Sequence, residues 1–115
     1  MNRNQANKII IEGINVNIFD LPELPLTEEL ITVLTESENI RIERIISAGQ
    51  ISSDWYDQAE TEFVVLLEGC ADITFDNGKI VNMKKGDTLR IKPHEKHKVS
   101  RTSSEPPCVW LCIFY

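Results

Sequence analysis

The chain has few of the side chains that most often carry chemistry or cross-links. It contains three cysteines and two histidines in 115 residues. An odd, small number of cysteines disfavours a disulfide-stapled fold, so a reducing compartment is expected. Imidazole chemistry near neutral pH is limited to His94 and His97.

Long apolar runs and a basic excess are also missing. No run approaches the roughly 18 to 20 residues that cross a bilayer. The first eight residues lack the apolar core and small-residue cleavage site of a secretory signal. A net charge of −6 and a pI near 4.9 disfavour general nucleic-acid binding. We therefore expect a cytoplasmic protein that binds neither nucleic acid nor membrane.

The charges that are present are unevenly distributed along the chain. Residues 20–62 hold eleven acidic residues against Arg41 and Arg44, whereas residues 79–101 hold eight basic residues against Asp87 and Glu95. One interpretation is that the two segments neutralise each other across a shared surface. The other is a local positive field that attracts a small anionic ligand.

The length fits one domain, residues 1–115, with two structural parts after a disordered start over residues 1–8. In the first part, residues 9–38, Ile14, Val16 and Ile18 alternate with polar residues and predict a strand over 9–19. Thr27 is a suitable N-cap, and the apolar stripe that follows predicts one short helix over 27–37.

The second part, residues 39–115, reads as short strands separated by glycine and proline turns. Asp76-Asn77-Gly78 is a tight-hairpin signal. Many such strands predict an all-β sandwich or barrel. The last segment, 108–115, is continuously apolar, so it must be central or covered. That segment and the apolar run 63–67 lead us to expect a homodimer.

Two spaced motifs carry a resemblance to a known family. Segment 49–69 reads G-x5-W-Y-D-x4-E-x6-G. It resembles the first motif of the cupin superfamily, G-x5-H-x-H-x4-E-x6-G, of the small single-domain type. The glutamate is Glu62, but the two histidine places hold Trp55 and Asp57. A spacing one residue shorter, which the family also allows, puts those places at Tyr56 and Gln58.

Segment 86–101 reads G-x5-K-P-H-x2-H-x3-R and is similar to the second cupin motif, G-x5-P-x-G-x2-H-x3-N. The histidine is retained as His97. The proline is displaced by one position to Pro93, His94 replaces the glycine, and Arg101 replaces the asparagine.

The resemblance implies an antiparallel jelly-roll barrel with a pocket in its mouth, to which the sequence adds the short N-terminal helix. In the family, the histidines and the glutamate hold a divalent metal, commonly iron, manganese, nickel or zinc. Only Glu62 and His97 match as they stand, and Asp57 is the candidate third ligand.

Two functions follow from this pocket, and the sequence leaves both open. The first is a metal-dependent enzyme that acts on a small oxygenated or carboxylated molecule, with Arg90 or Arg101 orienting an anionic group. The second is a metal-free module that binds or senses a small molecule. Besides the metal-ligand candidates, the residues expected to line the pocket are Trp55, Tyr56, Gln58, Arg90, His94 and Arg101.

Overall fold

The structure, a computed structural model, describes residues 8–11, 13–23 and 25–115. These residues form strands, turns and irregular segments, and no helix occurs among them. The part of the chain that is described therefore contains no helix able to cross a membrane. The strands are β1 (Lys8–Ile10), β2 (Leu30–Glu36), β3 (Arg41–Ser47), β4 (Glu62–Glu68), β5 (Cys70–Phe75), β6 (Ile80–Lys84), β7 (Thr88–Ile91), β8 (His97–Thr102) and β9 (Cys108–Phe114).

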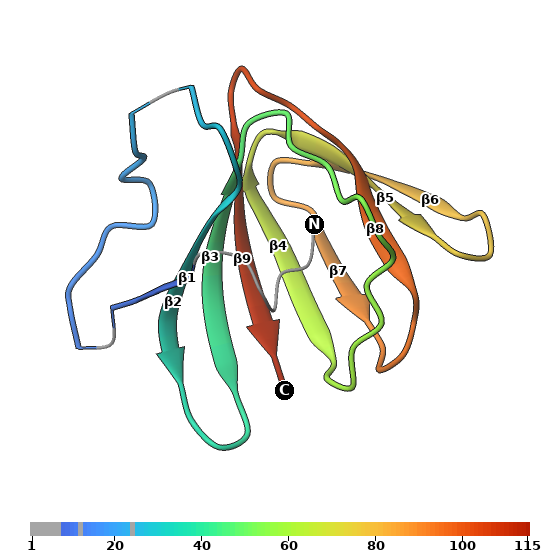
Figure 1. Cartoon of the computed structure of the whole chain (residues 1–115), viewed down its shortest axis with the longest axis horizontal. Helices are drawn as coiled ribbons and strands as arrows, with labels where there is room; N and C mark the ends of the chain where they lie inside the picture. The colour runs from blue at the N-terminus through green and yellow to red at the C-terminus, as the bar shows by residue number, and fades with distance from the viewer. Residues whose placement is uncertain (1–7, 12, 24) are drawn as a thin grey trace.

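The strands make two sheets that enclose one core (Figure 1). The larger sheet has the order β1-β2-β3-β9-β4-β7, and the smaller has the order β6-β5-β8. The pairing is antiparallel except between β1 and β2. This arrangement is a jelly-roll barrel, which confirms the predicted fold class.

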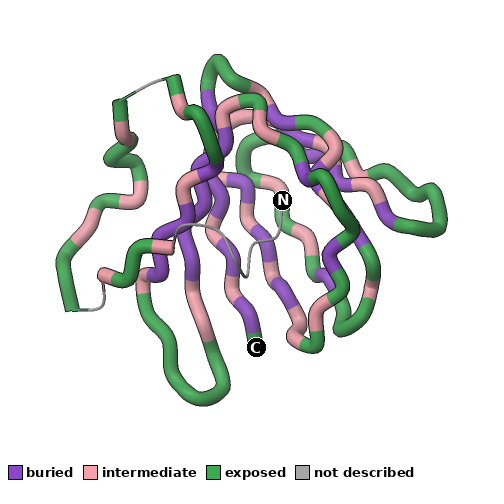
Figure 2. Tube along the Cα trace, in the orientation of Figure 1, coloured by how far each residue is buried: buried purple, intermediate pink, exposed green. Residues whose placement is uncertain are grey.

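The core follows the two-residue period of the strands. Buried and partly exposed residues alternate along β4, β5 and β9, as Figure 2 shows. Trp110 is 1% exposed, and its indole N–H donates to Ser47 Oγ at 3.1 Å. Ile45 and Leu66 flank Trp110 on the neighbouring strands in register. A tryptophan is satisfied in an apolar core only when its N–H has such a partner.

The apolar C-terminal segment is central, as predicted. Strand β9 lies between β3 and β4 and is hydrogen-bonded to both. Cys108 and Cys112 are not joined in a disulfide, and both are buried on the inward face with Trp110. They therefore act as small core residues, which confirms the sequence interpretation.

The predicted helix over residues 27–37 is wrong, because this segment forms strand β2. Its apolar residues suit either period, but Ile31 and Val33 point into the core opposite β3. The segment is rich in β-branched side chains, which lose rotamer freedom in a helix and pack well in a sheet. Pairing with β3 decides between the two structures.

The strand predicted over residues 9–19 is mostly wrong as well. Strand β1 ends at Ile10, and residues 13–20 form turns and irregular backbone instead of a strand. Arg44 donates hydrogen bonds to the backbone carbonyl groups of Asn17, Ile18 and Asp20, at 3.4, 3.2 and 2.9 Å. In a strand, these carbonyl groups would instead accept from a neighbouring strand. Of the predicted disordered start, residues 1–7 lie outside the described residues, and Lys8 belongs to β1.

The hairpin between β5 and β6 forms where Asp76-Asn77-Gly78 predicts it. Gly78 has a φ of 90°, and its N–H donates to the carbonyl of Phe75 at 2.9 Å. Asn77 Oδ1 accepts from the N–H of Lys79 at 2.9 Å. Asparagine and glycine fit this turn because both tolerate positive φ and bond locally.

Candidate functional site

Glu62 and His97 meet inside one end of the barrel. Glu62 is the first residue of β4 and shares the inward face with Val64 and Leu66. His97 is the first residue of β8 and shares the inward face with Val99. The side chains are 0% and 1% exposed, and Nε2 of His97 lies 3.7 Å from Oε1 of Glu62.

The hydrogen bond made by Nδ1 of His97 determines whether Nε2 donates or accepts. Nδ1 lies 2.9 Å from the carbonyl oxygen of Glu95, which can only accept a hydrogen bond. This network assigns the proton of the neutral ring to Nδ1 and leaves Nε2 as an acceptor. Nε2 is buried and has no hydrogen-bond partner among the described residues. It therefore presents an unused lone pair toward the interior.

Residues 55–58, which we call the covering segment, close this end of the barrel. They lie between β3 and β4 and run beside β8 in Figure 1. The backbone of Tyr56 exchanges two hydrogen bonds with His97, at 2.7 and 3.2 Å, and the two rings meet edge to face at 5.5 Å. Gln58 Nε2 donates to Glu62 Oε1 at 3.2 Å. Tyr56 and Gln58 thus touch the buried pair directly.

Asp57, expected as a metal ligand, lies on the other side of the covering segment. Its Oδ1 is 2.7 Å from Nδ1 of His94, and both side chains are exposed. His94 has a φ of 59° in the turn before β8. Trp55 is also exposed, with Nζ of Lys98 4.5 Å above its ring. Because the segment is extended, alternate residues face opposite ways. Tyr56 and Gln58, the positions given by the shorter motif spacing, are the ones that face inward.

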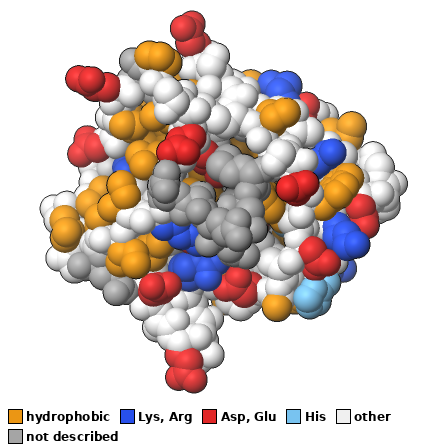
Figure 3. All heavy atoms as spheres, in the orientation of Figure 1, with side chains coloured by type: hydrophobic (Ala, Val, Ile, Leu, Met, Phe, Trp, Pro, Cys, Tyr) orange, Lys and Arg blue, Asp and Glu red, His pale blue; other side chains and the backbone are white. Residues whose placement is uncertain are grey.

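The two arginines expected to orient an anion are outside the barrel. Arg90 on β7 is exposed and pairs in register with Phe63, on the face away from the core. Arg101 on β8 is exposed and holds Asp72 through Nε and Nη2 at 3.0 and 3.2 Å. On the face shown in Figure 3, charges of both signs are interspersed.

A buried carboxylate that the sequence analysis missed lies at the same end of the barrel. Glu43 on β3 is 0% exposed, and its Oε2 accepts from Arg41 Nε and Lys8 Nζ, both at 2.8 Å. Its Oε1 is buried without a hydrogen-bond partner among the described residues. In the sequence, Ile40 and Ile42 read as the inward residues of this strand, so Arg41 and Glu43 read as solvent-facing.

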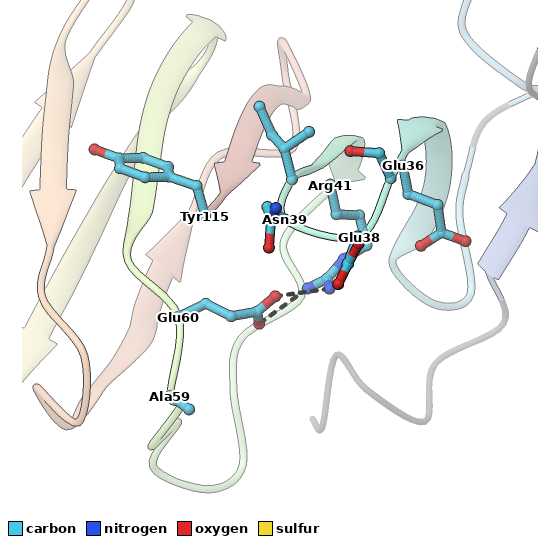
Figure 4. A pocket seen from close by; sticks show the side chains of 9 residues that line it. Glu36, Glu38, Asn39, Arg41, Ala59, Glu60 and Tyr115 are labelled. Atoms are coloured by element: carbon cyan, nitrogen blue, oxygen red, sulfur yellow. Dashed lines mark hydrogen bonds and ion pairs between the residues drawn. The ribbon is translucent and has the colours of Figure 1, made fainter.

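A pocket of about 330 Å³ opens beside this end of the barrel (Figure 4). Its wall includes Arg41, whose guanidinium group bonds Glu60 at 2.9 and 3.4 Å. Arg41 also stacks on the ring of Phe114 at 4.3 Å and reaches Glu43. Arg41 therefore separates the pocket from the buried carboxylate. The pocket is lined by Glu36, Ser37, Glu38, Asn39, Ile40, Arg41, Ala59, Glu60 and Tyr115.

The donor set does not fit a resident divalent metal. A catalytic metal usually needs about three protein ligands and an open position. Glu62 and His97 supply two, while Asp57 is engaged by His94 at the surface. Across the part of the chain that the structure describes, no three His, Cys, Asp or Glu side chains are grouped so as to hold a metal ion.

The structure is a small antiparallel β-barrel with polar side chains at one end, and the comparisons identify its family. The profile described as Cupin domain matches residues 43–114, more than half of the chain. The chain therefore belongs to the cupin family. No curated protein matches it.

Several solved structures share the fold. A structure from Ralstonia eutropha JMP134, described as a "putative mannose-6-phosphate isomerase", is 33% identical, with a TM-score of 0.82. The match covers 88% of this chain and 96% of that one. A cupin superfamily protein from Desulfitobacterium hafniense DCB-2 is 21% identical, with a TM-score of 0.70 and coverage of 81% and 82%. A conserved Streptococcus pyogenes protein of unknown function is 16% identical, with a TM-score of 0.70 and coverage of 89% and 86%.

Proposed function

We propose that this cupin binds a small molecule inside the barrel at Glu62 and His97, without a resident metal. The observation that supports this most directly is the unpaired Nε2 of His97 beside the Glu62 carboxylate. A buried polar atom without a partner costs about 1–3 kcal/mol. A ligand that donates the missing hydrogen bond to Nε2 would remove that free-energy cost.

The covering segment provides a route for entry. Its contacts with the pair include the Gln58–Glu62 hydrogen bond of 3.2 Å, the Tyr56–His97 ring contact and the short bridge between the backbones of Tyr56 and His97. Rotation of the Gln58 side chain would free Glu62 Oε1 without disturbing a strand. Loops on a rigid barrel commonly carry this kind of motion.

A second candidate function is proton transfer on a hydroxycarbonyl compound. It is favoured by the hydrogen bond from Nδ1 to Glu95, which leaves Nε2 of His97 as a proton acceptor. Nε2 would take the proton from the carbon next to the carbonyl group and return it to the former carbonyl carbon. Glu62 would carry the hydroxyl proton from one oxygen to the other, so the aldose becomes a ketose without a redox change. The 33% identical Ralstonia protein is described as a "putative mannose-6-phosphate isomerase".

Binding can be tested by calorimetry and thermal shift with a panel of monosaccharides, hydroxy acids and sugar phosphates. At least one compound should raise the melting temperature, because a ligand of the folded state stabilises it by mass action. His97→Asn keeps a donor for the Glu95 carbonyl but removes Nε2, so binding should be lost. His97→Gln keeps a polar atom near Nε2 and should retain part of it.

Asp76→Asn is the matched control, because Asp76 is exposed in the turn between β5 and β6 and should not affect binding. Equal binding by His97→Asn and the parent protein would refute the proposal. The isomerase candidate has its own readout, which is His97-dependent deuterium incorporation next to the carbonyl group in heavy water.

The metal content of the protein can be measured directly. Because no third His, Cys, Asp or Glu among the described residues is grouped with Glu62 and His97, elemental analysis of protein purified without chelator should give well below one iron, manganese, nickel or zinc per chain. EDTA should leave the melting temperature unchanged. A stoichiometric metal whose removal lowers the melting temperature would favour the metal-dependent alternative.

A further inference from the structure

The unpaired atoms at this end of the barrel are hydrogen-bond acceptors. Nε2 of His97, whose Nδ1 bonds the Glu95 carbonyl, and Oε1 of the Glu43 carboxylate are both buried without partners among the described residues. Arg44 Nε also lacks a partner, but it lies on the opposite, outer face beneath residues 17–20. A ligand inside the barrel therefore meets acceptors that need donors.

The two acceptors belong to one end of the barrel. Arg41, Phe114 and Glu62 form a row across β3, β9 and β4 in register. Glu43 lies two residues further along β3, on the same inward face. His97 faces Glu62 from the smaller sheet at 3.7 Å. The strand order thus brings acceptors from both sheets to the same region.

The two cations at this end are already paired with carboxylates. Lys8 and Arg41 both contact Glu43, and Arg41 also holds Glu60. Neither cation is therefore left over to receive an anionic ligand. A carboxylate or phosphate group would place its oxygens against unpaired acceptors and add a negative charge, which is unfavourable in a buried site.

We infer that the ligand is a neutral, hydroxyl-rich molecule, a sugar or polyol without phosphate or carboxylate groups, and that Glu43 is a second recognition residue beside His97. This inference rests on the proposed function and adds the chemical class of its ligand. Hydroxyl groups donate to Nε2 and Oε1, while Tyr56 and Phe114 offer aromatic surface to the C–H groups of such a molecule. The sequence analysis raised the possibility of an anionic ligand, and this inference favours a neutral ligand in its place.

The test compares matched neutral and anionic probes by calorimetry on the full chain. Mannose and mannitol are the neutral probes, and mannose 6-phosphate and gluconate are the anionic ones. The neutral probes should bind at least tenfold more tightly. Glu43→Gln presents an amide in place of one acceptor, so it should reduce the preference for neutral over anionic probes at least tenfold.

Glu60→Gln is the control, because Glu60 shares Arg41 but is more than one-third exposed and outside the buried pair. It should leave the preference unchanged, and melting curves will verify that both variants fold. Tighter binding of an anionic probe would overturn this inference while leaving the proposed function standing. An unchanged preference in Glu43→Gln would overturn the role of Glu43. Failure of every probe at millimolar concentration, with water on both atoms in a crystal structure, would overturn both proposals.

Discussion

Arg101 illustrates how one side chain sets the chemistry of its neighbours. Its guanidinium group is fixed by Asp72 and donates through Nη1 to Cys70 Sγ at 3.5 Å. This hydrogen bond lowers the pKa of the Cys70 thiol. Burial has the opposite effect on Cys108, whose pKa is raised. The two thiols should therefore differ in reactivity, because the thiolate is the nucleophile.

Alkylation by iodoacetamide measures this difference. In the folded protein at neutral pH, Cys70 should react and Cys108 should not. Because the pKa of Cys70 is lowered, its rate should rise at lower pH than that of an ordinary thiol, and Arg101→Gln should move the profile to higher pH. Arg90→Gln, on the outer face of the other sheet, should leave the profile in place. A profile unchanged by Arg101→Gln would contradict the role of Arg101.

The site shows where residue-level prediction ends. Motif spacing located Glu62 and His97, since both stand where the family pattern needs them. The same spacing cannot decide whether Asp57 or Gln58 faces inward, because a shift of one residue reverses every side chain of an extended segment. Glu43 was missed for a related reason: a charged residue that continues the alternation of Ile40, Arg41 and Ile42 reads as solvent-facing until its buried partners are known.

At the scale of elements, hydrogen bonds from Arg44 hold residues 17–20 against the larger sheet. Arg44 donates to the carbonyl groups of Asn17, Ile18 and Asp20, and its Nη2 donates to Thr32 at 3.2 Å. These bonds keep residues 17–20 over Arg44, on the outward face of β3. The segment has little regular structure of its own, so it depends on this one side chain.

Arg44→Met should release that segment while retaining apolar bulk. Hydrogen bonds to a charged group contribute about 1.5–3 kcal/mol, so the free energy of unfolding should fall by about 2 kcal/mol. Amide hydrogen exchange over residues 13–20 should accelerate most. Lys84→Met on the exposed side of β6 serves as a control and should change neither quantity. Unaltered exchange over residues 13–20 would contradict this account.

Two glycines at positive φ allow strain and crowding to be separated. Gly69 and Gly78 have φ values of 87° and 90°. A Cβ on Gly69 would lie 2.8 Å from Ser103 Oγ and 2.9 Å from Cys108 Cα, whereas nothing lies within 4 Å of one on Gly78. Only the first position combines an unfavourable backbone conformation with a close approach between strands.

Urea unfolding of the two alanine variants tests this distinction. Gly78→Ala should lower the free energy of unfolding by about 1 kcal/mol, from backbone strain alone. Gly69→Ala should lower it by more than about 3 kcal/mol, since a neighbouring backbone must also move. Equal losses would show that crowding at Gly69 is relieved without cost.

The strands illustrate which elements a sequence can specify. Strands β4 to β9 alternate or end in recognisable turns, and they were predicted with the correct class. Strand β2 was not, because its apolar residues satisfy the helical and the strand period equally. Its identity depends on β3 supplying a partner, and that contact is non-local. The irregular course of residues 13–20 likewise depends on Arg44, far away in the sequence.

At the scale of the molecule, the outer face of the larger sheet presents half-buried apolar side chains. Phe63 pairs with Ile113 in register, and Val65 pairs with Leu111. Apolar residues on the outward side of two central strands are typical of a face that a second subunit covers. The expectation of a homodimer therefore stays a prediction.

Light scattering at micromolar concentration decides this point. The mass should be twice the chain mass of 13.1 kDa, and Val65→Lys should shift it toward the single chain. Ile80→Lys is a matched control, because Ile80 is an exposed apolar residue of β6 in the smaller sheet. A parent protein with the mass of one chain would rule out the dimer.

The central place of β9 has a consequence for how the barrel comes into being. Strands β3 and β4 never touch in the larger sheet; β9, residues 108–114, joins them. During synthesis, β3 and β4 each keep one edge unpaired until β9, which follows both in the sequence, emerges from the ribosome. Non-local pairing of this kind slows folding and leaves aggregation-prone strand edges exposed in the meantime. The row that links Arg41 to Glu62 can therefore form only after β9 has been made, because Phe114 of β9 lies between them.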